Sequence, residues 1–269
     1  MKKTLIAFLL ATLSASSTVM ASSLPIPLDP ETAAKAVSTS LQAAKSKPPV
    51  IDLLVIHSSK VSSDRITEIV NITNKALADS KANVSVNKMC ETVDDNWANV
   101  QPSVGLYRLI SSAESKAKLA RLIRNACKAD LVVYVAPLRA EDNVCGVSRV
   151  NLKFNPRLGY MVVRDGIGGG YYCPGTTLAH EFGHQLGADH DRAHASHNMV
   201  DGYTAVAYPF SFGYGVDGVF GDIMSYIGPQ VPLYSSPNIN CVENTPCGTV
   251  DDDAVRTFNL TARRVSKYK

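Results

Sequence analysis

Apolar positions along the chain follow two patterns, short uninterrupted runs and longer stretches with helical spacing. Residues 50–56 (VIDLLVI) and 131–136 (LVVYVA) are apolar runs typical of strands buried on both faces. Residues 63–80 and 113–128 place apolar side chains at helical spacing. A further strand is expected near residues 83–93. Strands that alternate with helices predict an α/β fold with a mostly parallel sheet.

The same patterns give finer expectations. The helix over residues 113–128 is expected to bury one face, formed by Leu119, Leu122, Ile123 and Ala126. Shorter strands are expected at residues 145–150 and 159–164. The glycine run at residues 166–170 lacks a phosphate-binding pattern and is interpreted as a flexible loop. The aspartates at residues 251–253 suit the start of a last helix, with a calcium site as the alternative.

The segment that begins at His180 reads HEFGHQLGADHD and supplies the ligands of a catalytic metal site. His180 and His184 stand at positions i and i+4, so a helix projects both from one face. Gly187 permits the left-handed backbone that ends a helix, and the turn can bring back His190 as a third ligand. Three protein ligands leave one position for water, which is typical of a catalytic zinc ion. Glu181 is placed to reach that water as general base.

This pattern, with its glycine and third histidine at fixed offsets, resembles the metzincin metalloproteases, and Asp191 resembles their adamalysin or reprolysin branch. The resemblance implies a Met-turn, which residues 221–226 (GDIMSY) fit, with Met224 as the floor of the zinc site. Adamalysins usually carry a cysteine where this chain has Asp222. The chain is therefore more similar to bacterial reprolysin-like enzymes, including the peptidyl-Asp metalloendopeptidases. The resemblance covers roughly residues 50–266.

The resemblance implies a metzincin-type α/β (α+β) fold. It has a twisted, mostly parallel sheet with an antiparallel edge strand, an active-site helix, and a smaller irregular C-terminal subdomain ending in a helix. Residues 145–150 would be the edge strand, whose free backbone groups pair with an extended substrate. Tyr226 stands where astacins and serralysins place a tyrosine that moves onto and off the zinc, so it is a candidate oxyanion donor; a core tyrosine is the alternative. Asp191 is expected to fix the Met-turn or a histidine ring.

The predicted function is zinc-dependent hydrolysis of proteins or peptides, with one zinc ion held by His180, His184 and His190. Glu181 is the expected general base and Tyr226 the second catalytic candidate. Two alternatives remain: a catalytically weak zinc-binding protein that acts by docking, and a zinc amide hydrolase of non-protein substrates. The presence of Glu181 disfavours the docking protein, because loss of this base usually marks such degeneration.

Two cleavage preferences remain open. The chain after the Met-turn, residues 227–237, is expected to wall the pocket beside the zinc with Val231, Leu233 and Tyr234, which suits an apolar side chain. The family resemblance instead implies cleavage before aspartate, which requires a cation near the pocket. Residues 227–237 contain no lysine or arginine, so such a cation would have to come from elsewhere in the chain, with Arg192 as the candidate.

The N-terminus has the pattern of an export signal. Two lysines precede an apolar run at residues 5–13, and Val19-Met20-Ala21 forms a cleavage site, so residues 1–21 are expected to be a signal peptide. The run is too short to span a membrane, and no membrane anchor is expected. Residues 22–48 are expected to be a short pro-segment or linker with one helix. Residues 49–269 then form the catalytic domain of a secreted or periplasmic protein.

Composition adds two constraints. The formal net charge is +3 over 269 residues, and two lysines lie in the signal segment, so nothing favours nucleic acid as a partner. A monomer is expected. The six cysteines of an exported chain predict three disulfides, and sequence alone leaves fifteen connectivities open. Pairing neighbours along the chain would join Cys90 to Cys127, Cys145 to Cys173, and Cys241 to Cys247.

Overall fold

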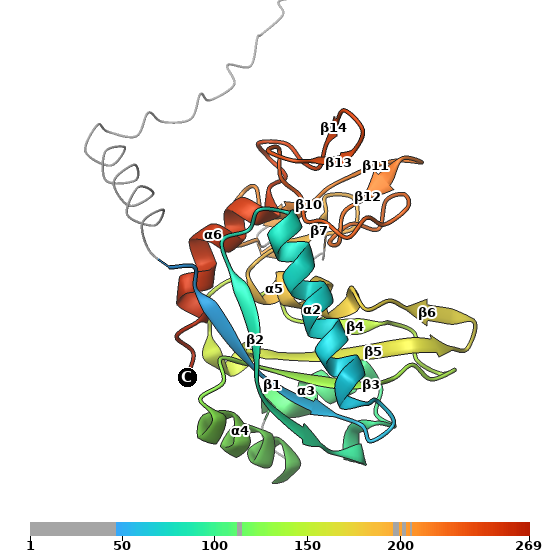
Figure 1. Ribbon diagram of the computed structural model, residues 1–269, viewed down its shortest axis with the longest axis vertical. Helices are drawn as coiled ribbons and strands as arrows, with labels where there is room; N and C mark the ends of the chain where they lie inside the picture. The colour runs from blue at the N-terminus through green and yellow to red at the C-terminus, as the bar shows by residue number, and fades with distance from the viewer. Residues whose placement is uncertain (1–46, 112–114, 196–198, 201–202, 205) are drawn as a thin grey trace, which may run out of the picture. The chain divides into compact units, whose positions relative to one another are not determined.

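A mostly parallel sheet of six strands organises the fold, with the order β2-β1-β3-β5-β4 and with β6 paired to β5 (Figure 1). The parallel members are β1 (Val50–His57), β2 (Ser85–Val93), β3 (Leu131–Pro137) and β5 (Tyr160–Gly168). β4 (Gly146–Ser148) is antiparallel to β5 and forms one edge of the sheet. The mixed α/β class and the antiparallel edge strand are therefore confirmed.

The computed structural model describes residues 47–111, 115–195, 199–200, 203–204 and 206–269. The signal segment and most of residues 22–48, where one helix is expected, lie outside the described residues. Residues Pro48–Lys269 cluster as one unit. In the described part of the chain, no helix has the length and apolar character needed to cross a membrane.

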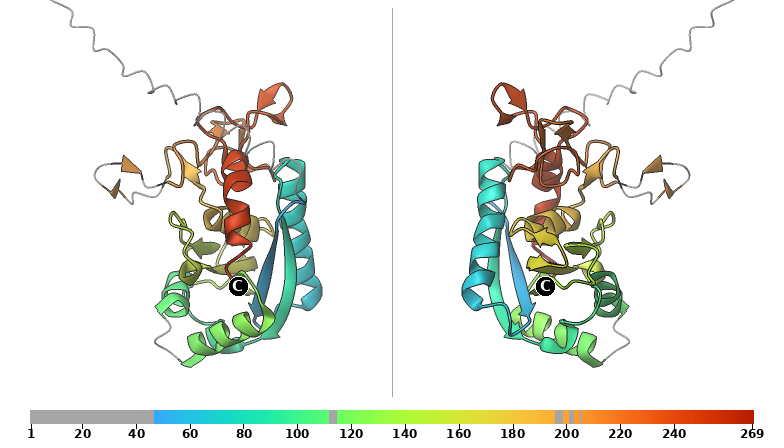
Figure 2. Two further views of the ribbon diagram at one scale, coloured as in Figure 1. Left: turned by 90° about the vertical axis from the view of Figure 1, so that its left-hand side faces the viewer. Right: turned by 90° about the vertical axis from the view of Figure 1, so that its right-hand side faces the viewer.

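Alternate residues of β1 face two separate cores because successive side chains of a strand point to opposite faces. Ile51, Leu53 and Val55 belong to a core shared with α2 (Ser63–Asp79), α5 (Thr177–Gln185) and α6 (Ala254–Val265). Leu54 and Ile56 belong to a second core, shared with α3 (Pro102–Ser111) and α4 (Ser115–Cys127). Figure 2 shows α2 along one face of the sheet. The central strands are thus covered on both faces, as their apolar runs predicted.

The helix α4 confirms the element predicted over residues 113–128, but its predicted core face was only partly right. Ile123 packs against the second core, whereas Ala126 is exposed. Leu119 and Leu122 are 52% and 65% exposed, whereas Ala117 and Ala120 are buried. Small side chains therefore let this helix lie close to the sheet, and its leucines turn outward. The sequence prediction also missed α3, since Gly105 lowers its helix propensity. Packing outweighs that cost, because Gly105 is buried near Val162 of β5.

The glycine run at residues 166–170 is a tight hairpin and not the flexible loop that was expected. β5 extends to Gly168 and pairs antiparallel with β6 (Tyr171–Cys173). Gly169 and Gly170 form the turn with φ values of 58° and 83°. Glycine adopts two consecutive positive φ angles readily, which explains the run of glycines.

Three disulfides join neighbouring cysteines, as the simplest pairing predicted: Cys90–Cys127, Cys145–Cys173 and Cys241–Cys247. The first joins β2 to α4, and the last closes the hairpin of β13 (Asn240–Val242) and β14 (Thr245–Pro246). The second joins the residue before β4 to the end of β6. The edge strand is therefore covalently held to the neighbouring hairpin.

The chain after α5 is irregular and ends in α6, as expected. Its short strands are β7 (Asp189–Asp191), β8 (Met199–Val200), β9 (Tyr203–Thr204), β10 (Phe212–Gly213), β11 (Gly215–Val216) and β12 (Phe220–Gly221). Earlier in the chain, two 3-10 helices cover Asp95–Trp97 and Pro156–Leu158. Asp253 caps α6, because its side chain accepts a hydrogen bond from the backbone N–H of Arg256. Asp252 instead pairs with Arg192 at 2.6 Å. The Asp253 contact confirms capping, and the ion pair with Arg192 engages the carboxylate of Asp252.

The contrast between β1 and α4 can be tested by removing leucine side chains. Leu54→Ala should lower the free energy of unfolding by about 2–5 kcal/mol, because it leaves a cavity in the core. Leu122→Ala should change it by less than about 0.5 kcal/mol, because this side chain lies at the surface. Urea unfolding of the two variants measures the difference. Equal destabilisation would contradict the observed orientation of α4.

Candidate active site

The three histidines of the motif come from a helix and from the strand that follows its turn. His180 and His184 lie one turn apart on α5, so their side chains leave the same face. The helix ends at Gln185, and Gly187 follows its cap residue with a φ of 94°, in the left-handed region that favours glycine. The chain then reverses into β7, which carries His190 back to the helix. The sequence predicted this arrangement, including the turn at Gly187.

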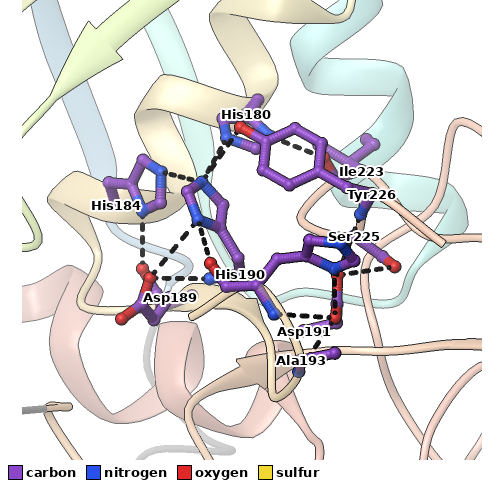
Figure 3. A network of polar contacts seen from close by, with 11 residues as sticks. His180, His184, Asp189, His190, Asp191, Ala193, Ile223, Ser225 and Tyr226 are labelled. Atoms are coloured by element: carbon purple, nitrogen blue, oxygen red, sulfur yellow. Dashed lines mark hydrogen bonds and ion pairs between the residues drawn. The ribbon is translucent and has the colours of Figure 1, made fainter. Parts of the chain in front are cut away.

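The imidazole rings converge through their Nε2 atoms (Figure 3). Nε2 of His190 lies 3.1 Å from Nε2 of His180 and 3.2 Å from Nε2 of His184. Each Nδ1 meets a backbone carbonyl: Ile223 at 2.7 Å for His180, Ala188 at 2.9 Å for His184, and His194 at 3.2 Å for His190. When Nδ1–H donates to a carbonyl, the neutral ring keeps a lone pair on Nε2. Three lone pairs therefore face one another, which suits a cation between them.

Burial keeps these rings neutral. It lowers the pKa of His184 to about 3 and the pKa of His180 well below its usual range. Burial also lowers the pKa of His190. Neutral imidazole is the form that binds metals, so the three rings fit a metal ion. Among the described residues, they are the group of three or more potential ligand side chains that lies close enough to hold one.

Glu181 is buried beside His180, and one of its two carboxylate oxygens has no hydrogen-bond partner in the described part of the chain. Oε2 is buried and has no hydrogen-bond partner among the described residues. Burial raises the pKa of Glu181 well above its usual range. The side chain also lines a cavity next to His180. A carboxyl group that lines a cavity and has an unpartnered oxygen is a candidate to exchange a proton with a bound molecule.

Gly146 of β4 belongs to the site, although the sequence analysis did not single it out. A Cβ atom at this position would lie 2.4 Å from Oε1 of Glu181. Glycine therefore allows the backbone of the edge strand to approach the carboxylate directly. Only the packing between β4 and α5 shows this requirement, because an isolated glycine in a short strand has several ordinary explanations.

Met224 lies directly beneath α5, as the predicted Met-turn requires. A Cβ atom at Gly183 would lie 2.4 Å from the sulfur of Met224. Met224 itself is fully buried. Gly183, the second variable position of the histidine motif, is therefore the point where the helix and the Met-turn make contact.

Asp191 links the Met-turn to β7, the strand that carries His190 (Figure 3). Its carboxylate accepts hydrogen bonds from the backbone N–H of Tyr226 at 2.9 Å and from the hydroxyl of Ser225 at 3.1 Å. It also pairs with Nδ1 of His194 at 2.8 Å. The prediction that Asp191 fixes the Met-turn is confirmed. His194 is engaged in this contact and is not one of the three converging rings.

Asp222 stands where adamalysins usually carry a cysteine, and its hydrogen bonds show its structural role. The side chain is fully buried, and its two oxygens accept the backbone N–H groups of Met224 at 3.0 Å and Ser235 at 2.6 Å. Burial raises the pKa of Asp222 to about 8, while these amide hydrogen bonds oppose the shift. The carboxyl group thus joins the Met-turn to the chain that follows it without a disulfide.

Tyr226 projects beside the histidines and does not belong to the core. It is 58% exposed, and its hydroxyl lies 3.2 Å from Nε2 of His190. The core-tyrosine alternative is therefore wrong. The hydroxyl therefore lies beside the converging Nε2 atoms.

A cavity of about 370 Å³ adjoins Glu181 and His180, with β4 along one side. Asn143, Val144, Pro174, Thr176 and Gln230 are among the residues that line it, and no lysine or arginine does so in the described structure. Segment 227–237 borders this cavity only through Gln230. The expected lining was wrong, because Val231, Leu233 and Tyr234 do not line the cavity, and Tyr234 is fully buried and donates its hydroxyl to the carbonyl of Ala179. Arg192 was also wrong as the cation of this pocket, since it is bound to Asp252.

Comparisons with known proteins agree with this geometry. A family model described as metallo-peptidase family M12B, reprolysin-like, matches residues 54–253. The Peptidyl-Asp metalloendopeptidase of Pseudomonas aeruginosa (strain PAO1) is 26% identical over 278 residues, which cover 88% of this chain and 43% of that protein. The chain thus spans less than half the length of this curated relative.

A solved structure shares the fold. A chain in a chaperone–substrate complex is similar with a TM-score of 0.63 at 22% identity, covering 83% of this chain and 35% of that chain. The family match is more specific, because it extends over most of the sequence and includes the three histidines, Glu181 and the Met-turn. The chain belongs to the reprolysin-like metallopeptidases of family M12B.

Proposed function

We propose that this protein is an exported, zinc-dependent endopeptidase. The observation that carries the proposal is the convergence of three imidazole Nε2 atoms next to a buried carboxylate with a free oxygen. Zinc is the proposed ion, because three histidines with an open fourth position are a common catalytic zinc site. His180, His184 and His190 would hold it. When bound, zinc would polarise the scissile carbonyl and lower the pKa of the attacking water.

Glu181 moves the proton in the proposed reaction. Its carboxylate takes a proton from the attacking water and later donates it to the nitrogen of the leaving amine. Gly146 allows the edge strand to pass close to this carboxylate. A substrate backbone that pairs with β4 would therefore present its scissile bond to Glu181. The free outer edge of β4 supports this binding mode, since β4 ends the strand order of the described sheet.

Tyr226 is the proposed donor to the developing oxyanion. Its exposed hydroxyl can turn from Nε2 of His190 toward a bound carbonyl. A positioned donor stabilises the charge that forms on that oxygen.

Export is part of the proposal. Three disulfides support it, because such bonds persist in oxidising compartments outside the cytoplasm. Residues 1–21 would be the export signal, 22–48 a pro-segment or linker, and 49–269 the catalytic domain. The substrates would be proteins or peptides. Incubation of the purified protein with casein, with and without a chelator, tests the activity: chelator-sensitive fragments support it, and intact casein with zinc-loaded protein contradicts it.

Glu181→Gln should remove hydrolysis while the protein still folds and binds zinc. The amide cannot accept the proton, and loss of general-base catalysis should lower kcat at least ~10²-fold. Glu243→Gln, an exposed change in the β13–β14 hairpin, is the matched control. Casein hydrolysis and bound zinc are measured for both. Near-normal activity of Glu181→Gln would refute the proposed role.

His190→Ala should lower zinc affinity sharply, because it removes one of three converging nitrogens. Native mass spectrometry gives the bound metal. His194→Ala is the control, since this ring pairs with Asp191 and should leave zinc bound. Full zinc occupancy in His190→Ala, or its loss in His194→Ala alone, would assign the third ligand elsewhere.

Tyr226→Phe should slow turnover more than it weakens substrate binding. Loss of one oxyanion donor costs ~10²- to 10³-fold in kcat, with little change expected in KM. Tyr171→Phe removes a hydroxyl from the exposed β6 hairpin and serves as control. If steady-state kinetics show equal kcat values for the two variants, Tyr226 has no part in catalysis.

A further inference from the structure

The active-site cleft continues on the far side of the histidines from Glu181. A second cavity of about 640 Å³ is lined by His184 and His190. Its remaining walls come from the end of β4, the loop that follows β4, and α3. The two cavities therefore flank the three rings, one beside His180 and Glu181 and the other beside His184 and His190.

The two cavities differ in charge. Arg149 and Lys153 line the second cavity, and both are exposed. No aspartate or glutamate lines it in the described structure. Neither cation forms an ion pair with any described residue, so both charges are available to a ligand. The first cavity, by contrast, has no lysine or arginine among its described lining residues.

The proposed chemistry orients a substrate along this cleft. Glu181 must donate its proton to the amine nitrogen of the broken bond. The residue that contributes this nitrogen therefore lies on the side of Glu181, in the first cavity. The residues that precede the cut lie on the other side of the rings, in the second cavity. Because Arg149 directly follows Ser148, the last residue of β4, a substrate paired with β4 passes beside it.

We infer that Arg149 and Lys153 select substrates with an aspartate or glutamate among the residues immediately before the scissile bond. The inference rests on the proposed endopeptidase function, which supplies the direction of the substrate. Two unpaired cations favour a carboxylate, because it gains attraction without having to displace an existing partner. The first cavity has no cation and accepts a neutral side chain on the amine side of the cut.

A proteome-derived peptide library cleaved by the zinc-loaded wild-type protein gives the first test. Aspartate and glutamate should be enriched within the few positions before the cut. Enrichment of acidic residues only after the cut, or at neither side, would overturn the inference.

Matched peptides then assign the selectivity to the two cations. Take the best library sequence with glutamate before the cut, and its glutamine counterpart. The wild type should favour the glutamate peptide in kcat/KM by about 3- to 10-fold, since each exposed charge pair contributes modestly. This ratio should fall toward one in the Arg149→Gln/Lys153→Gln variant, and in high salt. Arg157→Gln, an exposed change nearby that does not line the cavity, should keep the ratio. An unchanged ratio in the double variant would overturn the assignment.

Binding separates this inference from the proposed function. Two fluorescently labelled peptides of one fixed extended sequence, chosen independently of the library and differing only in glutamate or glutamine at one position, are titrated into the Glu181→Gln protein and followed by anisotropy. Tighter binding of the glutamate peptide supports the cation site even if no peptide is cleaved by the wild type, an outcome that would refute the proposed function alone. Equal binding, together with cleavage that ignores the charge, would refute the cation site while the endopeptidase function stands.

Discussion

The convergence of three imidazole lone pairs is the constraint on which the rest of the site depends. The Nε2 atom of His190 lies 3.1 Å from that of His180 and 3.2 Å from that of His184. Neutral Nε2 atoms with no proton between them repel unless a cation lies among them. Each ring is oriented by a carbonyl on its Nδ1 atom, and these carbonyls come from the Met-turn, the helix end and the loop after β7. The convergence of the three rings therefore depends on the relative positions of three separate segments of the chain.

Two buried carboxyl groups hold the Met-turn in place. Asp191 binds the turn at Tyr226 and Ser225, and Asp222 binds it at Met224 while also reaching Ser235. Burial of a carboxylate is unfavourable unless its oxygens are hydrogen-bonded. Backbone N–H groups provide those bonds here, so the turn is ordered by polar contacts where adamalysins usually have a cysteine.

Much of the site could be predicted from the sequence, because its parts lie close together along the chain. The i, i+4 spacing on a helix, the positive φ of Gly187 and the return of His190 are local geometry, and local geometry follows from residue type. Glu181 was placed by the same helix. The disulfide pairing followed from sequence proximity, although that argument gave a preference and could not exclude other connectivities.

The sequence by itself determined the α/β class, the order of the main elements, the histidine motif and its turn, because periodicity and residue type act over short distances. Only the tertiary structure decided which face of α4 is buried, why Gly146 must be glycine, and which residues border the two cavities. Leu122 has the spacing of a core residue, yet the close approach of Ala117 and Ala120 to the sheet turns it outward. Which side chains are buried depends here on distances between segments far apart in the chain, and a local sequence pattern does not determine those distances.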